Sequence, residues 1–287
     1  MCGIKVGVPV TNGVRFKIMS NTDDNNLALF CDFENIALGV RDEKQAKFDI
    51  NLVLERLLVK GSIVVKKAYC DWGRYKEFKA TMHEAAFELI DIPHVRMSGK
   101  NSADIRMVVD ALDLCYTKSH VNTFVIISGD SDFSPLVSKL RENAKTVIGV
   151  GVKNSTSDLL ISNCDEFIFY DDLVREQTQK TRKKARPAKG RATKRKAAKT
   201  RPKDKKQEGI DLALEVAAAL DAERGDQEKL WGSMVKQALK RVKPGFNEGY
   251  YGFDSFSKLL EEAQARGQLD LELDERSGGY IIRKVPN

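Results

Sequence analysis

Short apolar runs alternate with amphipathic stretches from Leu27 to Leu173, and this alternation constrains the fold more than any other feature of the chain. Short, continuously apolar runs predict strands that are buried on both faces, and apolar residues at helical spacing predict the helices that cover them. The predicted strands are 27–31, 62–70, 89–96, 123–127 and 146–152, the predicted helices are 51–60, 75–89, 102–116 and 135–143, and the segments 155–162 and 166–170 complete the series. Strands that alternate with helices form parallel β-α-β units, so we expect an α/β fold with a doubly wound parallel sheet.

Acidic residues follow two of the predicted strands at the points where these strands end. Asp32 comes directly after the first strand, and Asp130 and Asp132 come just after the strand 123–127. The carboxyl ends of parallel strands open into a shared crevice where the strand order reverses, so these acids are expected to converge. Asp104 lies in the first turn of a predicted helix and is expected to point toward the same edge.

Several carboxylates in one place repel one another unless a cation neutralises them. Ligand sets made only of oxygen suit Mg²⁺ or Mn²⁺, and such ions activate water and stabilise the leaving oxygen of a phosphodiester. Each acid also has a structural alternative: the Asp130–Asp132 pair can form an Asx turn or a helix cap, Asp104 can complement a helix dipole, and Asp32 can cap a turn. The joint pattern favours a metal-dependent phosphodiester-cleaving site.

Three motifs occur in order and at characteristic spacing. They are Asp32-Phe33-Glu34-Asn35, then Lys100-Asn101-Ser102-Ala103-Asp104 with Asp110-Ala111-Leu112, then Ser128-Gly129-Asp130-Ser131-Asp132-Phe133. Together they resemble the NYN domain, the LabA-like branch of the PIN-like nucleases, over about residues 27–173. The resemblance implies a metal-dependent ribonuclease whose catalytic and Mg²⁺- or Mn²⁺-binding acids are Asp32, Asp104, Asp130 and Asp132.

The same resemblance implies roles for three polar neighbours of these acids. Asn35 would be a polar neighbour of the substrate, Lys100 would steer or neutralise phosphate, and Ser128 would orient a ligand or water. Asp110 also matches the family pattern, but at about 100° per residue it is turned away from Asp104 on the same helix, which leaves a supporting or a purely structural role. Asp71, at the end of the strand 62–70, either lines the crevice or caps the following helix.

Basic residues are concentrated in one segment. Residues 175–206 hold 16 lysines and arginines against two acids, a net charge of +14, so the rest of the chain nets −7 within the total of +7. The segment has almost nothing to bury, so we expect residues 174–208 to form a disordered linker. Its charge favours contact with nucleic acid through counterion release, with a solvated linker or an anionic membrane surface as alternatives.

Residues 209–287 regain the apolar spacing of a folded domain. The pattern predicts helices at 210–222, 232–241 and 255–265, followed by a hairpin of the strands 269–273 and 280–283, which is a winged-helix layout. The run Pro244-Gly245-Phe246, then Tyr251-Gly252-Phe253, then Gly278-Gly279-Tyr280 resembles the OST-HTH/LOTUS module, which implies RNA binding or protein docking. An exposed Tyr250 or Tyr251 could stack on a base, with core packing as the alternative.

Composition excludes several other classes of protein. No stretch approaches the ~20 apolar residues of a membrane span. The five cysteines are widely spaced and form no Cys-x-x-Cys pair, so we expect structural thiols and a cytoplasmic location. Residues 1–26 are expected to form a flexible leader, with Met19 as an alternative start, because glycines and a proline interrupt any signal-like core.

These observations lead to two main hypotheses about function. The first is a divalent-metal-dependent endoribonuclease that acts on single-stranded RNA, with the linker holding the strand and the C-terminal module selecting or docking the substrate. The second is a non-catalytic RNA-binding regulator that keeps the acidic pocket for an ion or ligand. A Toprim-like phosphotransferase is a weaker third, because the Asp32-to-Asn35 spacing fits the NYN pattern better than a role for Glu34.

Overall fold

A six-stranded parallel sheet forms the larger part of the computed structural model, which describes residues 25–43, 47–93, 102–184, 202–224, 229–274 and 277–284. The strands are β1 (Asn26–Asp32), β2 (Ser62–Cys70), β3 (Glu88–Asp91), β4 (Thr123–Ile127), β5 (Thr146–Gly151) and β6 (Glu166–Phe169). They lie in the order β3-β2-β1-β4-β5-β6, and every neighbouring pair is parallel. The predicted α/β fold with a parallel sheet is confirmed. We call residues 25–184 the α/β region.

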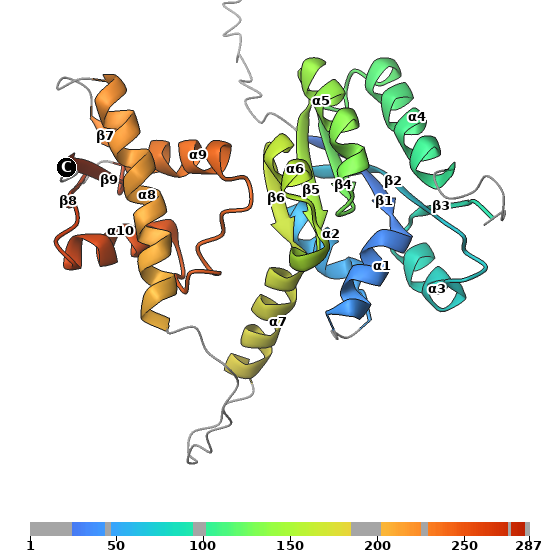
Figure 1. Ribbon diagram of the computed structural model, residues 1–287, viewed down its shortest axis with the longest axis horizontal. Helices are drawn as coiled ribbons and strands as arrows, with labels where there is room; N and C mark the ends of the chain where they lie inside the picture. The colour runs from blue at the N-terminus through green and yellow to red at the C-terminus, as the bar shows by residue number, and fades with distance from the viewer. Residues whose placement is uncertain are drawn as a thin grey trace, which may run out of the picture.

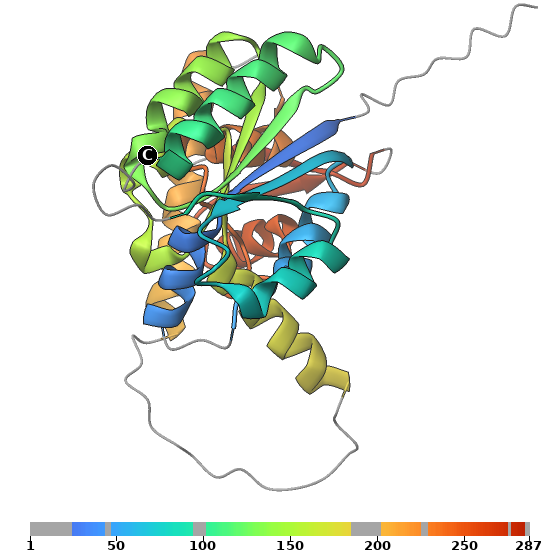
Figure 2. The same cartoon turned by 90° about the vertical axis from the view of Figure 1, so that its right-hand side faces the viewer.

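Helices cover both faces of this sheet (Figures 1 and 2). One face packs against α1 (Phe33–Asp42), α2 (Ile50–Leu58), α3 (Lys76–Glu84) and the start of α7 (Tyr170–Lys184), and the other against α4 (Ser102–Thr117), α5 (Ser134–Glu142) and α6 (Asp158–Asn163). Side chains alternate between faces along a strand, so Leu29 enters one core while Phe30 enters the other, where it stacks on Phe124. Burial on both faces explains why the central strands β1 and β4 are almost entirely apolar, whereas β2 and β3 toward the edge carry partly or fully exposed charged residues.

The strand order reverses between β1 and β4. From β1 the chain proceeds through β2 to β3 on one side, and then crosses to β4, β5 and β6 on the other. The connections that leave the carboxyl ends of β1 and β4 therefore diverge, which opens a crevice at this edge. The short 3-10 helices η1 (Ser131–Phe133) and η2 (Lys153–Ser155) follow β4 and β5 at the same edge.

A smaller C-terminal region, residues 202–284, has its own core. It contains α8 (Pro202–Arg224), α9 (Gly232–Val242) and α10 (Phe256–Ala265), with β7 (Leu230–Trp231), β8 (Asp270–Leu273) and β9 (Tyr280–Lys284) in an antiparallel sheet of order β7-β9-β8. Ile210, Val235, Phe256, Leu259 and Ile282 are among its buried residues. The helices and hairpin match the predicted elements, and the short strand β7 was missed.

Helices extend into the segment predicted to be a disordered linker at 174–208. Helix α7 continues to Lys184, and α8 begins at Pro202. The prediction therefore has to be corrected at both ends, because side chains there find partners in the folded regions. Glu176 pairs with Arg56 on α2, and Gln207 accepts a hydrogen bond of 2.7 Å from Arg266. The rest of the predicted linker, residues 185–201, and residues 1–24 of the predicted leader lie outside the described residues.

The cysteines and the helices agree with two further expectations. Cys31, Cys70, Cys115 and Cys164 are buried free thiols, as expected for structural cysteines, and Cys2 lies outside the described residues. Among the helices that the structure describes, none is long and apolar enough to cross a bilayer.

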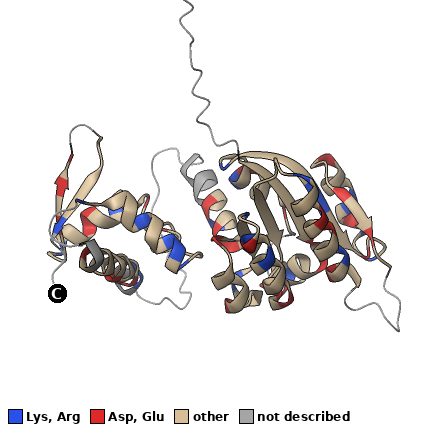
Figure 3. Ribbon diagram, turned by 90° about the horizontal axis from the view of Figure 1, so that it is seen from above, with Lys and Arg blue, Asp and Glu red and all other residues tan. Residues whose placement is uncertain are grey.

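The C-terminal region contacts the edge strand β6. The amide of Phe167 donates a hydrogen bond of 2.9 Å to the carbonyl of Pro244, in the turn after α9. Beside it, Glu166 accepts from Lys60 of the α/β region at 2.6 Å and from Lys240 of α9 at 3.2 Å. Figure 3 shows the basic end of α9 facing the α/β region. One backbone hydrogen bond and a shared carboxylate thus join the two regions.

We expect Lys240→Glu to loosen this contact, because it replaces an attraction to Glu166 by a repulsion. Hydrogen exchange of the Phe167 amide should accelerate about two- to fivefold, the size expected for a partly exposed ion pair worth about 0.5–1 kcal/mol. Arg241→Glu is the matched control, since this exposed neighbour makes the same charge change on α9. Equal exchange rates in the two variants would show that the ion pair does not hold the regions together.

Candidate active site

A cavity of about 310 Å³ opens at the carboxyl ends of β1 and β4, where the strand order reverses. Its acidic lining residues are Asp32, Glu34, Asp71, Asp104 and Asp130, and the other lining residues are Asn35, Leu38, Tyr69, Cys70, Ile92 and Ala103. The acids come from the ends of β1, β2 and β4 and from the first turns of α1 and α4. We call it the acidic cavity.

Asp32 lies at the base of the acidic cavity and is only 8% exposed. It ends β1 and is also the N-cap of α1, where its Oδ1 accepts a hydrogen bond of 3.3 Å from the amide of Asn35. Its Oδ2 accepts a second hydrogen bond of 2.9 Å from the hydroxyl of Ser128. Asp32 therefore has both of the roles considered for it: it caps α1 and it lines the acidic cavity.

The loop after β4 is fixed to the end of β1. The Ser128 hydroxyl accepts from the amide of Asp130 at 3.2 Å, and the side-chain oxygen of Asn35 accepts from the amide of Gly129 at 2.9 Å. A Cβ at Gly129 would lie 2.5 Å from the backbone oxygen of Ser155, so only glycine fits here. These contacts hold Asp130 beside Asp32 across two strands.

Asp104 and Asp132 occupy different positions. Asp104 is half-buried in the first turn of α4 and lines the acidic cavity. Asp132 is exposed and lines a neighbouring hollow with Ser134 and Pro135, and its amide donates a 3.0 Å hydrogen bond to Asp130. Of the four predicted acids, the structure brings Asp32, Asp104 and Asp130 into one cavity and places Asp132 at its side.

Burial and mutual repulsion raise the pKa values of these acids. Burial raises the pKa of Asp32 from its ordinary 3.8 to about 7, and the charge of Asp104 adds to it, against the hydrogen bonds from Ser128 and Asn35. The pKa of Asp104 is also raised, first by burial and then by the charges of Asp130, Asp132 and Glu34. The acidic cavity therefore concentrates negative charge that its own hydrogen bonds do not neutralise.

The acidic cavity suits a hard cation, because the five acids that line it offer carboxylate oxygens as ligands. Within the part of the chain that the structure describes, no group of three or more His, Cys, Asp or Glu side chains is arranged around a common point at ligand distance. The acids are thus gathered in one cavity without forming a closed coordination shell. Small side-chain rotations would be needed to bring them onto one ion.

The other predicted site residues are distributed around the acidic cavity. Asn35 lines it, and Ser128 is fully buried behind it with its hydroxyl shared by Asp32 and Asp130. Lys100 lies outside the described residues. A role of Asn35, Lys100 or Ser128 in substrate binding therefore stays a prediction.

Asp110 supports the wall of the acidic cavity from outside it. It accepts hydrogen bonds from Tyr69 at 2.9 Å, from Lys67 at 3.3 Å and from Arg106 at 3.0 Å. Burial would raise its pKa, but the hydrogen bonds from Tyr69 and Lys67 outweigh burial and lower it. Because Tyr69 lines the acidic cavity, Asp110 links α4 to the β2 side of that cavity.

Two residues near the rim were not predicted as part of the site. Glu34 lines the acidic cavity, and Arg74 donates a hydrogen bond of 3.0 Å to it from the loop after β2. Asp71 also lines the acidic cavity, as one of the two roles considered for it required. It does not cap the following helix, because the N-cap of α3 is Tyr75, and its Oδ1 instead accepts from the amide of Gly73 at 2.9 Å and closes a turn. The position of Arg74 follows no motif, since only the folded chain brings it to Glu34.

We expect the melting temperature of the metal-free protein to depend on Asp32. Between about pH 4 and about 7 the folded state keeps a proton that the unfolded chain has released, so the free energy of unfolding falls as pH rises. In EDTA near pH 8, Asp32→Asn should therefore melt about 2 °C or more above the parent. Asp113→Asn, on the exposed side of α4, is the control. The raised pKa predicts that Asp32→Asn gains melting temperature over the parent as the pH rises. If the two proteins differ by the same amount at acid and at alkaline pH, the raised pKa is wrong.

Comparison with known proteins identifies the α/β region. A curated protein of Methanocaldococcus jannaschii, described as uncharacterized, is 26% identical over 178 residues, which cover 61% of this chain and 68% of that protein. The crystal structure of a protein of unknown function from Vibrio parahaemolyticus has 26% sequence identity and a TM-score of 0.48, and covers 54% of this chain and 98% of that one. The sequence profile of the NYN domain matches residues 26–171, which is half of the chain. The protein therefore belongs to the NYN domain family, as the motifs predicted.

Proposed function

We propose that this protein is a divalent-metal-dependent endoribonuclease that cleaves phosphodiester bonds in single-stranded RNA. The observation that supports this most directly is the acidic cavity, where Asp32, Asp104 and Asp130 meet at the switch point of the sheet. The raised pKa values of Asp32 and Asp104 support it further, because a bound cation would compensate the negative charge that burial and neighbouring carboxylates make unfavourable here. Membership of a nuclease-related family is consistent with this chemistry.

Each residue has a distinct part in this proposal. Asp32, Asp104 and Asp130 would hold the cation, with Asp132 as a further acid at the edge. A bound Mg²⁺ or Mn²⁺ would activate water and neutralise charge on the phosphodiester. Ser128 keeps Asp32 and the loop of Asp130 in register through two hydrogen bonds. Because these contacts use backbone and buried groups, the carboxylates are positioned before substrate arrives.

The C-terminal region would bring RNA to this site or dock a partner. Its resemblance to the OST-HTH/LOTUS module and the basic residues that precede it support this part of the proposal. The α/β region and the C-terminal region are both acidic or nearly neutral apart from that segment, so cations at 175–206 would supply much of the attraction for phosphate.

Cleavage of labelled single-stranded RNA tests the proposal, with matched DNA beside it and with Mg²⁺, Mn²⁺ or EDTA present. We expect metal-dependent RNA cleavage that Asp130→Asn reduces at least about a hundredfold while RNA binding is retained, since the lost carboxylate serves the chemical step. Asp113→Asn should cleave like the parent. Binding without cleavage in every ion would instead favour the non-catalytic regulator, and cleavage by Asp130→Asn at the parent rate would contradict the assignment of the site.

A thermal melt gives a second, independent prediction. Mn²⁺ should raise the melting temperature of the parent more near pH 8 than near pH 6, because protons compete with the ion for the Asp32 carboxylate. Asp104→Asn should lose most of the shift, whereas Asp113→Asn on the same helix should keep it. A shift of equal size in both variants would place the ion outside the acidic cavity.

A further inference from the structure

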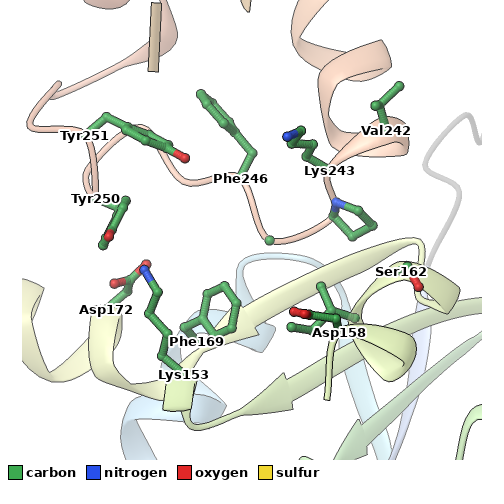
Figure 4. A pocket seen from close by; sticks show the side chains of 13 residues that line it. Lys153, Asp158, Ser162, Phe169, Asp172, Val242, Lys243, Phe246, Tyr250 and Tyr251 are labelled. Atoms are coloured by element: carbon green, nitrogen blue, oxygen red, sulfur yellow. The ribbon is translucent and has the colours of Figure 1, made fainter. Parts of the chain in front are cut away.

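A second cavity, of about 350 Å³, lies between the α/β region and the C-terminal region. One wall comes from η2, α6, the end of β6 and the start of α7, and the other from the end of α9 and the turn and loop that follow it (Figure 4). We call it the interregional cleft. Its walls come from residues 153–172 and 242–251, which lie far apart in the sequence, so no local motif predicts the cleft.

Aromatic rings from both walls line the interregional cleft. Phe169 comes from the end of β6, and Phe246, Tyr250 and Tyr251 come from the loop after α9. Phe169 and Tyr250 are half-buried, so part of each ring surface remains accessible. Figure 4 shows Phe169 on one side of the cleft with Phe246 and the two tyrosines across from it. Phe246 is buried and stacks on Tyr251, with the ring centroids 5.3 Å apart, so it forms the floor of this wall. A partly accessible ring such as that of Phe169 accepts a planar base by stacking.

Cations gather at the same cleft. Lys153 and Lys243 line it, and the ammonium of Lys153 lies 3.4 Å from the centroid of the Tyr250 ring. Lys205 and Arg175 approach the same ring, at 4.5 Å and 5.4 Å from its centroid. Such cation–π contacts hold the cations at the edge of the cleft.

Two acids, Asp158 and Asp172, also line the interregional cleft. The buried Asp172 is paired with Arg175 at 2.7 Å, so its charge is compensated within the α/β region. The charged residues that line the interregional cleft are thus two lysines and two acids, with Lys205 and Arg175 beside them. The residues that line the acidic cavity include five acids and no lysine or arginine.

One loop joins the interregional cleft to the acidic cavity. Lys153 begins η2, which follows β5 at the same carboxyl edge of the sheet. The amide of Ser157, just past η2, donates a 3.0 Å hydrogen bond to the carbonyl of Gly129, next to Asp130. Ser155 packs against the same glycine. A strand that leaves the acidic cavity along this loop would reach Lys153 and the rings.

We propose that the interregional cleft binds one nucleotide of single-stranded RNA, with its phosphate on Lys153 and Lys243 and its base against the half-buried ring of Phe169. The choice of RNA rests on the function proposed above. The acidic cavity repels phosphate, so an extended substrate needs a cationic and aromatic subsite beside it, and the interregional cleft supplies both. A peptide would use the rings as well, but Lys153, Lys205 and Lys243 beside them favour a ligand that carries phosphate.

Binding of a short fluorescein-labelled single-stranded RNA to the full chain, followed by fluorescence anisotropy in EDTA, tests this inference without any cleavage. Lys243→Glu should lower the slope of log Kd against log salt by about one, as expected for one lost phosphate contact. Phe169→Leu should weaken binding about fivefold or more, since it removes a stacking ring but keeps an apolar side chain. Lys118→Glu is the matched control, because it makes the same charge change at the amino edge of the sheet, just before β4.

Photocrosslinking of 5-iodouridine RNA to the unmodified chain provides a readout that does not depend on any variant folding. Crosslinks to Phe169, Phe246 or Tyr250 would support the inference. Equal RNA affinity of Lys243→Glu and Lys118→Glu, with crosslinks elsewhere, would overturn it and leave the interregional cleft to a peptide or to packing alone. If RNA binding depends on the cleft residues but the protein cleaves no RNA, only the proposed nuclease activity is refuted. If the protein cleaves RNA but its binding does not depend on the cleft residues, only this inference is refuted.

Discussion

The hydrogen bond between Ser128 and Asp32 is the contact on which the candidate site depends. It joins the carboxyl ends of β1 and β4, the two central strands, at the point where the strand order reverses. The same hydroxyl also accepts from the amide of Asp130, so one buried group sets the spacing of two acids. The parallel sheet brings these ends together and the buried hydroxyl fixes them. Burial first, and then the charge of Asp104, raise the pKa of Asp32 to about 7.

Much of the α/β region follows from sequence alone because its strands are buried on both faces. Strand β4 coincides with the predicted run, since a continuous apolar segment bounded by polar residues has few other places in a fold. Strand β2 also has the predicted bounds, and its β-branched residues rather than full burial indicated it. Helix α1 was not predicted: it starts directly after β1, with Asp32 as its cap, so no turn residues separate the strand from the helix. In the candidate site, the strand ends correctly indicated that Asp32 and Asp130 meet.

Features formed by long-range contacts could not be predicted in this way. Asp130 caps η1 and faces the acidic cavity, but two residues later the turn has rotated Asp132 to the exposed side. The ends of α7 and α8 are helical because Glu176 and Gln207 find partners in other elements, which composition does not reveal. The interregional cleft brings Lys153 to Tyr250 only through docking of the C-terminal region on β6.

Metal rescue of a modified substrate tests the central claim most directly, because it asks whether an ion contacts the phosphate being cleaved. An RNA with sulfur in place of one non-bridging phosphate oxygen should be cleaved slowly in Mg²⁺, a hard ion, and faster in the more thiophilic Mn²⁺, while the unmodified RNA is cleaved in both. This switch in ion preference would establish a metal–phosphate contact during cleavage. Cleavage of unmodified RNA that persists in EDTA, or failure to cleave it in either ion, would contradict the account of the acidic cavity as a metal-dependent phosphodiester site.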